Sequence, residues 1–264
     1  MCESIIVIVN CVIMEILFLG TGTSTGVPQI GCHCRVCTSS DSRDMRLRAS
    51  ALVKVQGKNL LIDCGPDFRS QILTVDNPHI DAVLVTHSHY DHVGGFDDLR
   101  PFCADKALPV YARGDVLTDL RNRIPYCFLA HRYPGVPTFN LHEIHSEPFI
   151  CEEIEIEPLP VWHYKLPIVG YRIGNMAYIT DAKTIDDATI KRIEGIDTLI
   201  INSLRIEPHM SHMSLSETLA VIERVKPRQS FLIHMSHQMG LHSEVQDMLP
   251  AGVHLAYDGL RIMV

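Results

Sequence analysis

The stretch Val83-Leu84-Val85-Thr86-His87-Ser88-His89-Tyr90-Asp91-His92-Val93-Gly94-Gly95 decides the fold. It places three histidines and an aspartate within six residues, directly after an apolar segment. On an extended strand end, residues two apart point to the same side, so His87 and His89 can converge on one metal ion. Asp91 and His92 come after the bend and are expected to face another ion. The two glycines that follow allow the chain to turn closely behind this site. The stretch therefore predicts a metal centre at the end of a buried strand.

This His-x-His-x-Asp-His pattern resembles the signature of the metallo-β-lactamase superfamily of hydrolases, and the resemblance extends from about Met14 to the C-terminus. It implies an α/β fold, a four-layer αβ/βα sandwich with the metal ions at one edge of the two sheets. Members of the superfamily bind one or two ions, usually zinc and sometimes manganese or iron. The signature itself says little about the substrate.

Short apolar runs, each bounded by Gly, Asp or Asn, support the α/β expectation independently of the resemblance. Between several of them lie helical patterns, the clearest at residues 214–225, where Ser214 and Glu217 form a predicted capping box. The predicted strands are Leu60–Asp63, Ala82–Thr86, Leu108–Ala112, Ala177–Thr180, Thr198–Asn202, Phe231–Ile233 and Val253–Tyr257. Strands mixed with helices indicate a layered domain.

Composition fits an ordinary enzyme, because 264 residues with 46% hydrophobic content suffice for a substantial core. We find no linker or composition shift, so residues 14–264 are predicted to form a single domain. Residues 1–13 are interpreted as an N-terminal extension from an upstream start. They hold no Lys or Arg and are too short to span a membrane, so neither a signal peptide nor a membrane partner is expected.

Charge and cysteine content limit the expected binding partners and the expected cellular compartment. A net charge of −8 argues against a surface that grips nucleic acid as a whole, although it leaves a local basic patch open. Nine cysteines, with Cys32, Cys34 and Cys37 crowded together, favour reduced thiols and metal ligation over disulfides. A cytoplasmic location is therefore expected.

The superfamily resemblance implies the remaining ligands of the catalytic ions. It assigns His163 after a strand end to the first ion, His234 after the apolar run 231–233 to the second, and Asp181 to a bridging position. His142 and His145 lie nearer the first cluster in the chain, but their polar surroundings disfavour them as metal ligands. The full expected set is His87, His89 and His163 on the first ion, Asp91, His92 and His234 on the second, and Asp181 between them. Two such divalent ions, zinc or manganese, would hold a bridging hydroxide as the nucleophile.

A second metal site is predicted from Cys32, Cys34 and Cys37, whose spacing offers three thiolates to a structural zinc ion. His237 is the natural fourth ligand. Together with Leu19-Gly20-Thr21-Gly22-Thr23-Ser24, this loop resembles a branch of the superfamily typified by the cyclic-phosphate phosphodiesterase of bacterial phosphonate breakdown, which is related to tRNA 3′-end endonucleases. That resemblance implies a further catalytic histidine. His209 and His212 are the candidates, and the spacing to His234 favours His212.

These patterns predict a metal-dependent phosphodiesterase that hydrolyses a small cyclic phosphate diester, with His212 and Asp91 as its catalytic residues. His212 would orient the phosphate or protonate the leaving oxygen. A tRNA 3′-end endonuclease is the nearest competing function, but the chain lacks a Gly- and Lys-rich arm. A thioester or lactam hydrolase fits the pattern less well, and a non-catalytic zinc-stabilised binding module fits it least. The resemblance also implies a homodimer.

Overall fold

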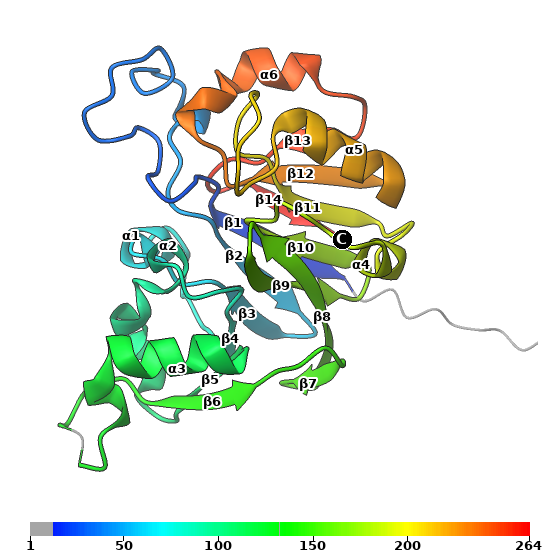
Figure 1. The fold of residues 1–264 in the computed structure, drawn as a ribbon. Helices are drawn as coiled ribbons and strands as arrows, with labels where there is room; N and C mark the ends of the chain where they lie inside the picture. Colours follow the sequence, from blue (N-terminus) through cyan, green and yellow to red (C-terminus); the bar gives the residue numbers. More distant parts are fainter. Residues whose placement is uncertain (1–12, 132) are drawn as a thin grey trace, which may run out of the picture.

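The computed structural model describes residues 13–131 and 133–264, so the predicted N-terminal extension, Ile13 apart, lies outside the described residues. Two seven-stranded sheets face each other in this structure (Figure 1). The first has the order β14 (Arg261–Met263), β1 (Met14–Gly20), β2 (Ser50–Val55), β3 (Lys58–Ile62), β4 (Ala82–Leu84), β5 (Leu108–Ala112) and β6 (Phe139–Glu143). The second has the order β13 (Val253–Leu255), β12 (Gln229–Ile233), β11 (Thr198–Asn202), β10 (Met176–Ile179), β9 (Leu166–Ile173), β8 (Ile154–His163) and β7 (Phe149–Cys151).

Helices cover the outer face of each sheet. The helices are α1 (Phe68–Ile72), α2 (Tyr90–Val93), α3 (Gly114–Arg123), α4 (Asp187–Arg192), α5 (Leu215–Val225) and α6 (His242–Met248), with 3-10 turns at Ser42–Asp44, Phe96–Cys103, Pro125–Phe128 and His237–Met239. Within the described ranges, no helix has the length and apolar character needed to cross a membrane.

Three apolar clusters correspond to the spaces between these layers. One lies between the sheets and includes Phe18, Tyr171 and Tyr178. A second joins the first sheet to α1 and α3, and a third joins the second sheet to the helices of the C-terminal half. Helix, sheet, sheet and helix layers therefore follow one another, which confirms the predicted αβ/βα sandwich.

The predicted strands overlap β3, β4, β5, β10, β11, β12 and β13, with ends that differ by up to two residues, and α5 begins at the predicted capping box. In that box the Ser214 backbone N–H donates to the Glu217 carboxylate at 2.8 Å. Strand β4 ends two residues earlier than predicted. The Asp63 carboxylate accepts from the Thr86 backbone N–H and hydroxyl, both at 2.8 Å, so the Thr86 N–H bonds to a side chain instead of a neighbouring strand of its sheet.

Candidate metal centre

The predicted ligands come from strand ends that meet at one edge of the two sheets. His87 to His92 follow β4 and open α2, His163 ends β8, Asp181 follows β10, and His234 follows β12. Asp181 and His234 both have φ of 56°, which is uncommon for residues with a side chain. Such strained conformations cluster at functional sites, where the surrounding structure maintains them.

Asp91, His92, Asp181 and His234 form one compact group of buried side chains, with ligand atoms within 4.8 Å of one another. His92 Nε2 lies 3.2 Å from Asp91 Oδ2 and 3.3 Å from Asp181 Oδ1, and His234 Nε2 lies 3.2 Å from Asp181 Oδ2. Ligands about 2.0–2.2 Å from a tetrahedral metal ion would be separated by roughly 3.4 Å. The group therefore has the dimensions of a metal cage.

The remaining histidines lie on the other side of Asp181. The ring centroids of His87 and His89 are 4.6 Å apart, and those of His89 and His163 are 5.1 Å apart. His87 Nε2 is 3.9 Å from Asp181 Oδ2. Asp181, His163 and His212 also offer ligand atoms that lie within 4.8 Å of one another. Asp181 thus lies between the two groups. The structure brings together all seven residues expected at the catalytic ions, and their ligation stays a prediction.

Unpartnered nitrogen atoms in this group fit a cation. Among the described residues, Nε2 of His87, His92 and His234 is buried without a hydrogen-bond partner, an arrangement that is costly unless another group binds there. Hydrogen bonds at the other ring nitrogen orient two of the rings. His92 Nδ1 lies 2.7 Å from Asp63 Oδ2, and His163 Nδ1 lies 2.8 Å from the Ser211 carbonyl. In each case Nδ1–H donates, so Nε2 is the ring atom that would face a metal ion.

Asp63 is a site residue that the sequence analysis missed. The side chain is fully buried and accepts from His92 and from both donors of Thr86. Its φ of 60° is uncommon for a residue other than glycine. Burial raises the pKa of Asp63, and its contacts with His92 and Thr86 oppose that rise. The signal was an aspartate at the end of the strand beside β4, which was interpreted only as a strand boundary.

Burial and neighbouring charges shift the pKa values of the titratable groups at this centre. Burial and the adjacent imidazoles hold the pKa of His87 well below its usual value. Burial would also lower the pKa of His92, but Asp181, Asp91 and Asp63 outweigh it and raise that pKa well above the usual value. Burial opposes ionisation of Asp181, yet His234 and His92 lower its pKa further than burial raises it. The Asp181 side chain is therefore an ionised carboxylate.

His212 lies closer to this group than His209. Its ring centroid is 4.5 Å from that of His163 and 5.0 Å from that of His234, and its Nδ1 is 3.8 Å from Asp181 Oδ2. Burial lowers the pKa of His212 to about 3. The His209 ring is 5.4 Å from His212, and its Nδ1 accepts from the Ser211 backbone N–H at 3.3 Å. His212 is thus positioned at the centre and His209 behind it.

The predicted structural zinc site is also assembled. The Sγ atoms of Cys32, Cys34 and Cys37 lie 3.2, 3.4 and 3.5 Å from His237 Nδ1. Bonds of about 2.3 Å to sulfur and 2.0 Å to nitrogen in a tetrahedron would place these atoms roughly 3.5 Å apart. A backbone hydrogen bond at Cys37 and the His237 ring help to lower the pKa of Cys34 to about 6, whereas burial raises the pKa of Cys37 to about 11. The donor set fits zinc.

The fold and the donor set define a hydrolase of the metallo-β-lactamase superfamily. Residues 58–235 match the model of the β-lactamase superfamily domain, and the chain belongs to this superfamily. More particularly, it is similar to a solved structure of a new diphosphatase from the PhnP family, at 38% identity and a TM-score of 0.89. That alignment covers 96% of this chain and 97% of the other.

Two curated relatives carry different names. An octanoyltransferase of Porphyromonas gingivalis is 45% identical over 95% of this chain, which spans only 52% of that protein's length. Coenzyme PQQ synthesis protein B of Methylobacterium radiotolerans is 36% identical over 72% of each chain. The chain thus matches about half of the first relative.

Proposed function

We propose that the protein is a two-metal phosphodiesterase that hydrolyses a small cyclic phosphate diester. The observation that carries this proposal is the position of Asp181 between two histidine-rich groups, with His212 beside both. Such an arrangement suits two divalent cations, zinc or manganese. When bound, they would supply Lewis-acid chemistry, polarising a phosphoryl oxygen and lowering the pKa of water. The similarity to a PhnP-family diphosphatase supports reaction at phosphorus.

Each residue has a proposed task. His87, His89 and His163 hold the first cation, while Asp91, His92 and His234 hold the second. Asp181 contributes to both. His212 contacts the substrate, where its N–H orients a phosphoryl oxygen or donates to the leaving oxygen. Asp63 fixes the His92 ring through its Nδ1. Because the tasks differ, experiments can distinguish the loss of a bound cation from the loss of His212.

Cys32, Cys34, Cys37 and His237 are proposed to hold a third, structural zinc ion. Their loop precedes β2, and His237 follows His234 by three residues, so this ion would fasten the loop beside the catalytic edge. We further propose that residues 14–264 act as one hydrolase domain in the reducing cytoplasm. The homodimer stays a prediction.

A diphosphate is the second candidate substrate, because the diphosphatase similarity covers nearly the whole of both chains. Cyclic diesters and diphosphates both present a phosphorus atom bearing an oxygen leaving group. The same residues would serve either reaction, and substrate comparison separates them.

The test combines metal analysis with a substrate panel on freshly purified protein. The panel contains bis(p-nitrophenyl) phosphate, adenosine 2′,3′-cyclic phosphate, ADP-ribose and a p-nitrophenyl thioester, each with added zinc or manganese. Three metal ions per chain and hydrolysis of the cyclic phosphate support the proposal, whereas preference for ADP-ribose favours the diphosphate. Activity confined to the thioester, or a chain purified without bound metal, would refute the proposal. The Asp181→Ala variant controls for contaminating phosphatases.

A further inference from the structure

The loop between β11 and α5 carries His212 to the metal centre. Residues 203–214 of this loop lie outside the helices and strands. At its base the Leu204 backbone N–H donates to the Met213 carbonyl at 2.9 Å, which closes the loop. Most residues of its tip, 206–211, are exposed to solvent. The tip is therefore not held by burial, and side-chain contacts must fix its position.

The Arg205 side chain makes such contacts. Its Nε donates to the Glu207 carbonyl at 3.1 Å, and its Nη2 donates to the Pro208 carbonyl at 2.7 Å. Nη1 of the same guanidinium donates to Gln238 Oε1 at 2.8 Å. A guanidinium is planar and holds its N–H donors in a fixed fork, so three bonds in different directions define the position of the turn. Gln238 directly follows His237 of the proposed structural zinc site.

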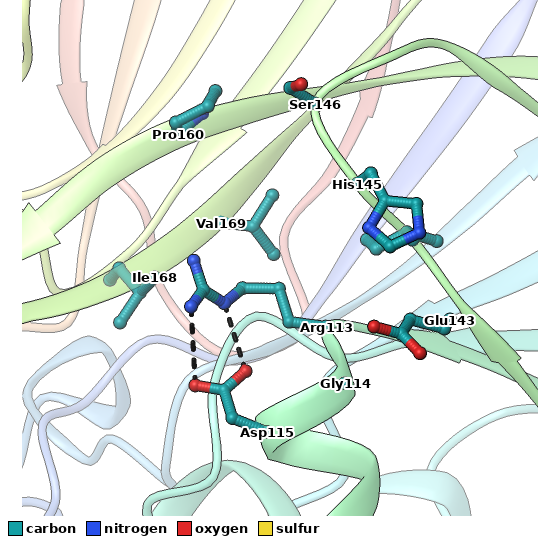
Figure 2. Close-up of a pocket in the computed structure, with 10 residues that line it drawn as sticks. Arg113, Gly114, Asp115, Glu143, His145, Ser146, Pro160, Ile168 and Val169 are labelled. Carbon is teal, nitrogen blue, oxygen red and sulfur yellow. Dashed lines mark hydrogen bonds and ion pairs between the residues drawn. The ribbon is translucent and has the colours of Figure 1, made fainter.

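Arg205 differs from two arginines of the first sheet and its helix, which are paired with carboxylates. A cavity of about 570 Å³ is lined by the start of α3 and by residues of β8 and β9, and Figure 2 shows Arg113 paired with Asp115 in it. Arg123 Nε likewise donates to Asp119 at 2.7 Å. The three partners of Arg205 are uncharged oxygens. Hydrogen bonds from a charged donor are stronger than neutral ones, which suits this guanidinium to holding backbone carbonyls in place.

The tip of the loop places two groups at the metal centre. The Ser211 carbonyl accepts from His163 Nδ1 at 2.8 Å and so orients a predicted ligand. The His212 ring centroid lies 4.5 Å from that of His163. Within the tip, the Ser211 backbone N–H donates to His209 Nδ1 at 3.3 Å, one residue beyond Pro208. A displacement of the Pro208 carbonyl would therefore reach both the Ser211 carbonyl and the His212 ring.

We propose that Arg205 is a positioning residue, whose guanidinium fixes the turn that places the His212 ring and the Ser211 carbonyl at the metal centre. The inference rests on the proposed function, in which His212 contacts the substrate. Arg205 acts through the loop and does not touch the reacting atoms. Through Gln238, the same guanidinium joins this loop to the segment that carries His237.

The kinetic test uses Arg205→Ala and Arg205→Lys in the zinc-loaded protein, with bis(p-nitrophenyl) phosphate as the substrate. We expect kcat to fall by about 10–100-fold in Arg205→Ala with KM retained, since this is the usual range for loss of an outer-shell partner. Arg205→Lys should lower kcat by a similar factor, because an ammonium group lacks the planar fork. Wild-type kcat in Arg205→Lys would show that charge alone suffices, and a raised KM with kcat retained would show that Arg205 binds substrate. Either result overturns the inference.

Arg172→Ala is the matched control. Arg172 Nε donates to the Gly174 carbonyl at 3.1 Å, also two residues further along the chain, and its Nη1 donates to the Arg192 carbonyl. It lies near the end of β9 opposite to Leu166, which pairs with His163. This variant should lower the melting temperature without changing kcat. An equal decrease of kcat in Arg172→Ala and Arg205→Ala would reduce the effect of Arg205 to general stability and overturn the inference.

A double-mutant cycle tests whether Arg205 acts through His212. The decrease of kcat caused by Arg205→Ala should be much smaller in the His212→Gln background than in the wild type, because coupled residues give non-additive effects. Equal fold decreases in both backgrounds overturn the inference.

A measurement without substrate separates this inference from the proposed function. The histidine ring signals of the zinc-loaded protein are recorded by NMR after ¹⁵N-labelling of histidine, and His212→Gln identifies the His212 signal. Arg205→Ala should shift that signal, and Arg172→Ala should not. An unchanged His212 signal in Arg205→Ala overturns the inference whatever the protein hydrolyses. A shifted signal in a protein that hydrolyses none of the phosphate substrates supports the positioning of His212 by Arg205 and refutes the proposed phosphodiesterase.

Discussion

Asp63→Asn tests the structural account of the metal centre most sharply, because it removes a charge without changing the size of a fully buried side chain. Asp63 Oδ2 accepts from His92 Nδ1 and the Thr86 hydroxyl, and Oδ1 accepts from the Thr86 backbone N–H. An asparagine has one oxygen for these two positions. Either orientation of the amide therefore points an NH₂ group at a donor.

The magnitude follows from the contacts at Asp63. If the NH₂ group faces His92, the ring must move its proton to Nε2, which removes the lone pair expected to bind metal. If it faces the Thr86 backbone, a buried N–H loses its acceptor. Loss of a hydrogen bond to a charged group costs about 1.5–3 kcal/mol, and loss of such an outer-shell partner typically weakens metal binding by about 10–100-fold. We expect a decrease of that size for one catalytic cation.

The assay is zinc titration against a chromophoric chelator, with thermal unfolding measured on the same samples. Asp81→Asn is the matched control, because Asp81 is a buried carboxylate that accepts from the Asn59 backbone N–H at the opposite end of β4. It should destabilise the fold without changing zinc affinity. If Asp63→Asn binds every zinc ion as tightly as the wild type, the orientation of His92 by Asp63 is refuted.

Three further changes separate the remaining roles. Asp181→Ala should lower turnover and metal content together, and full metal content by mass spectrometry would contradict its bridging position. His212→Gln should lower turnover by about 10²–10⁴-fold with the metals retained; metal loss measured on the same sample would show that His212 is a ligand. Cys34→Ser should remove one zinc ion and lower the melting temperature, because structural zinc binding is coupled to folding; an unchanged melting temperature would remove the structural-zinc assignment.

Local sequence patterns were sufficient to predict an α/β layered domain. The residues from Val83 to Gly95 combine a buried strand, a ligand cluster and a close turn in consecutive positions. In the structure an added Cβ on Gly95 would lie 2.1 Å from the Gly65 carbonyl, so this turn needs a residue without a side chain. The capping box at Ser214 likewise depends on residues three apart. Such features are visible in sequence because neighbours in the chain make them.

Strands that are polar and partly exposed were harder to predict from the sequence. No strand was predicted around His142, whose surroundings are polar, yet it is part of β6, where its ring stacks on Tyr111 at 4.6 Å. The neighbouring segment is polar and half-exposed, so hydrophobic periodicity was weak there. Pairing with β5 determines this strand, and that pairing depends on a distant part of the chain.

The sequence by itself predicted the candidate ligands and their positions at strand ends. The first cluster, His87 to His92, is encoded in a short run of neighbouring residues, whereas the superfamily resemblance assigned His163, Asp181 and His234. Only the tertiary structure decided that Asp63 orients His92 and that the His212 ring lies nearer to His163 and His234 than His209 does. Each of these depends on contacts between segments far apart in the chain. Side-chain direction and distance across two packed sheets are set by the packing of the whole core, which no local pattern specifies.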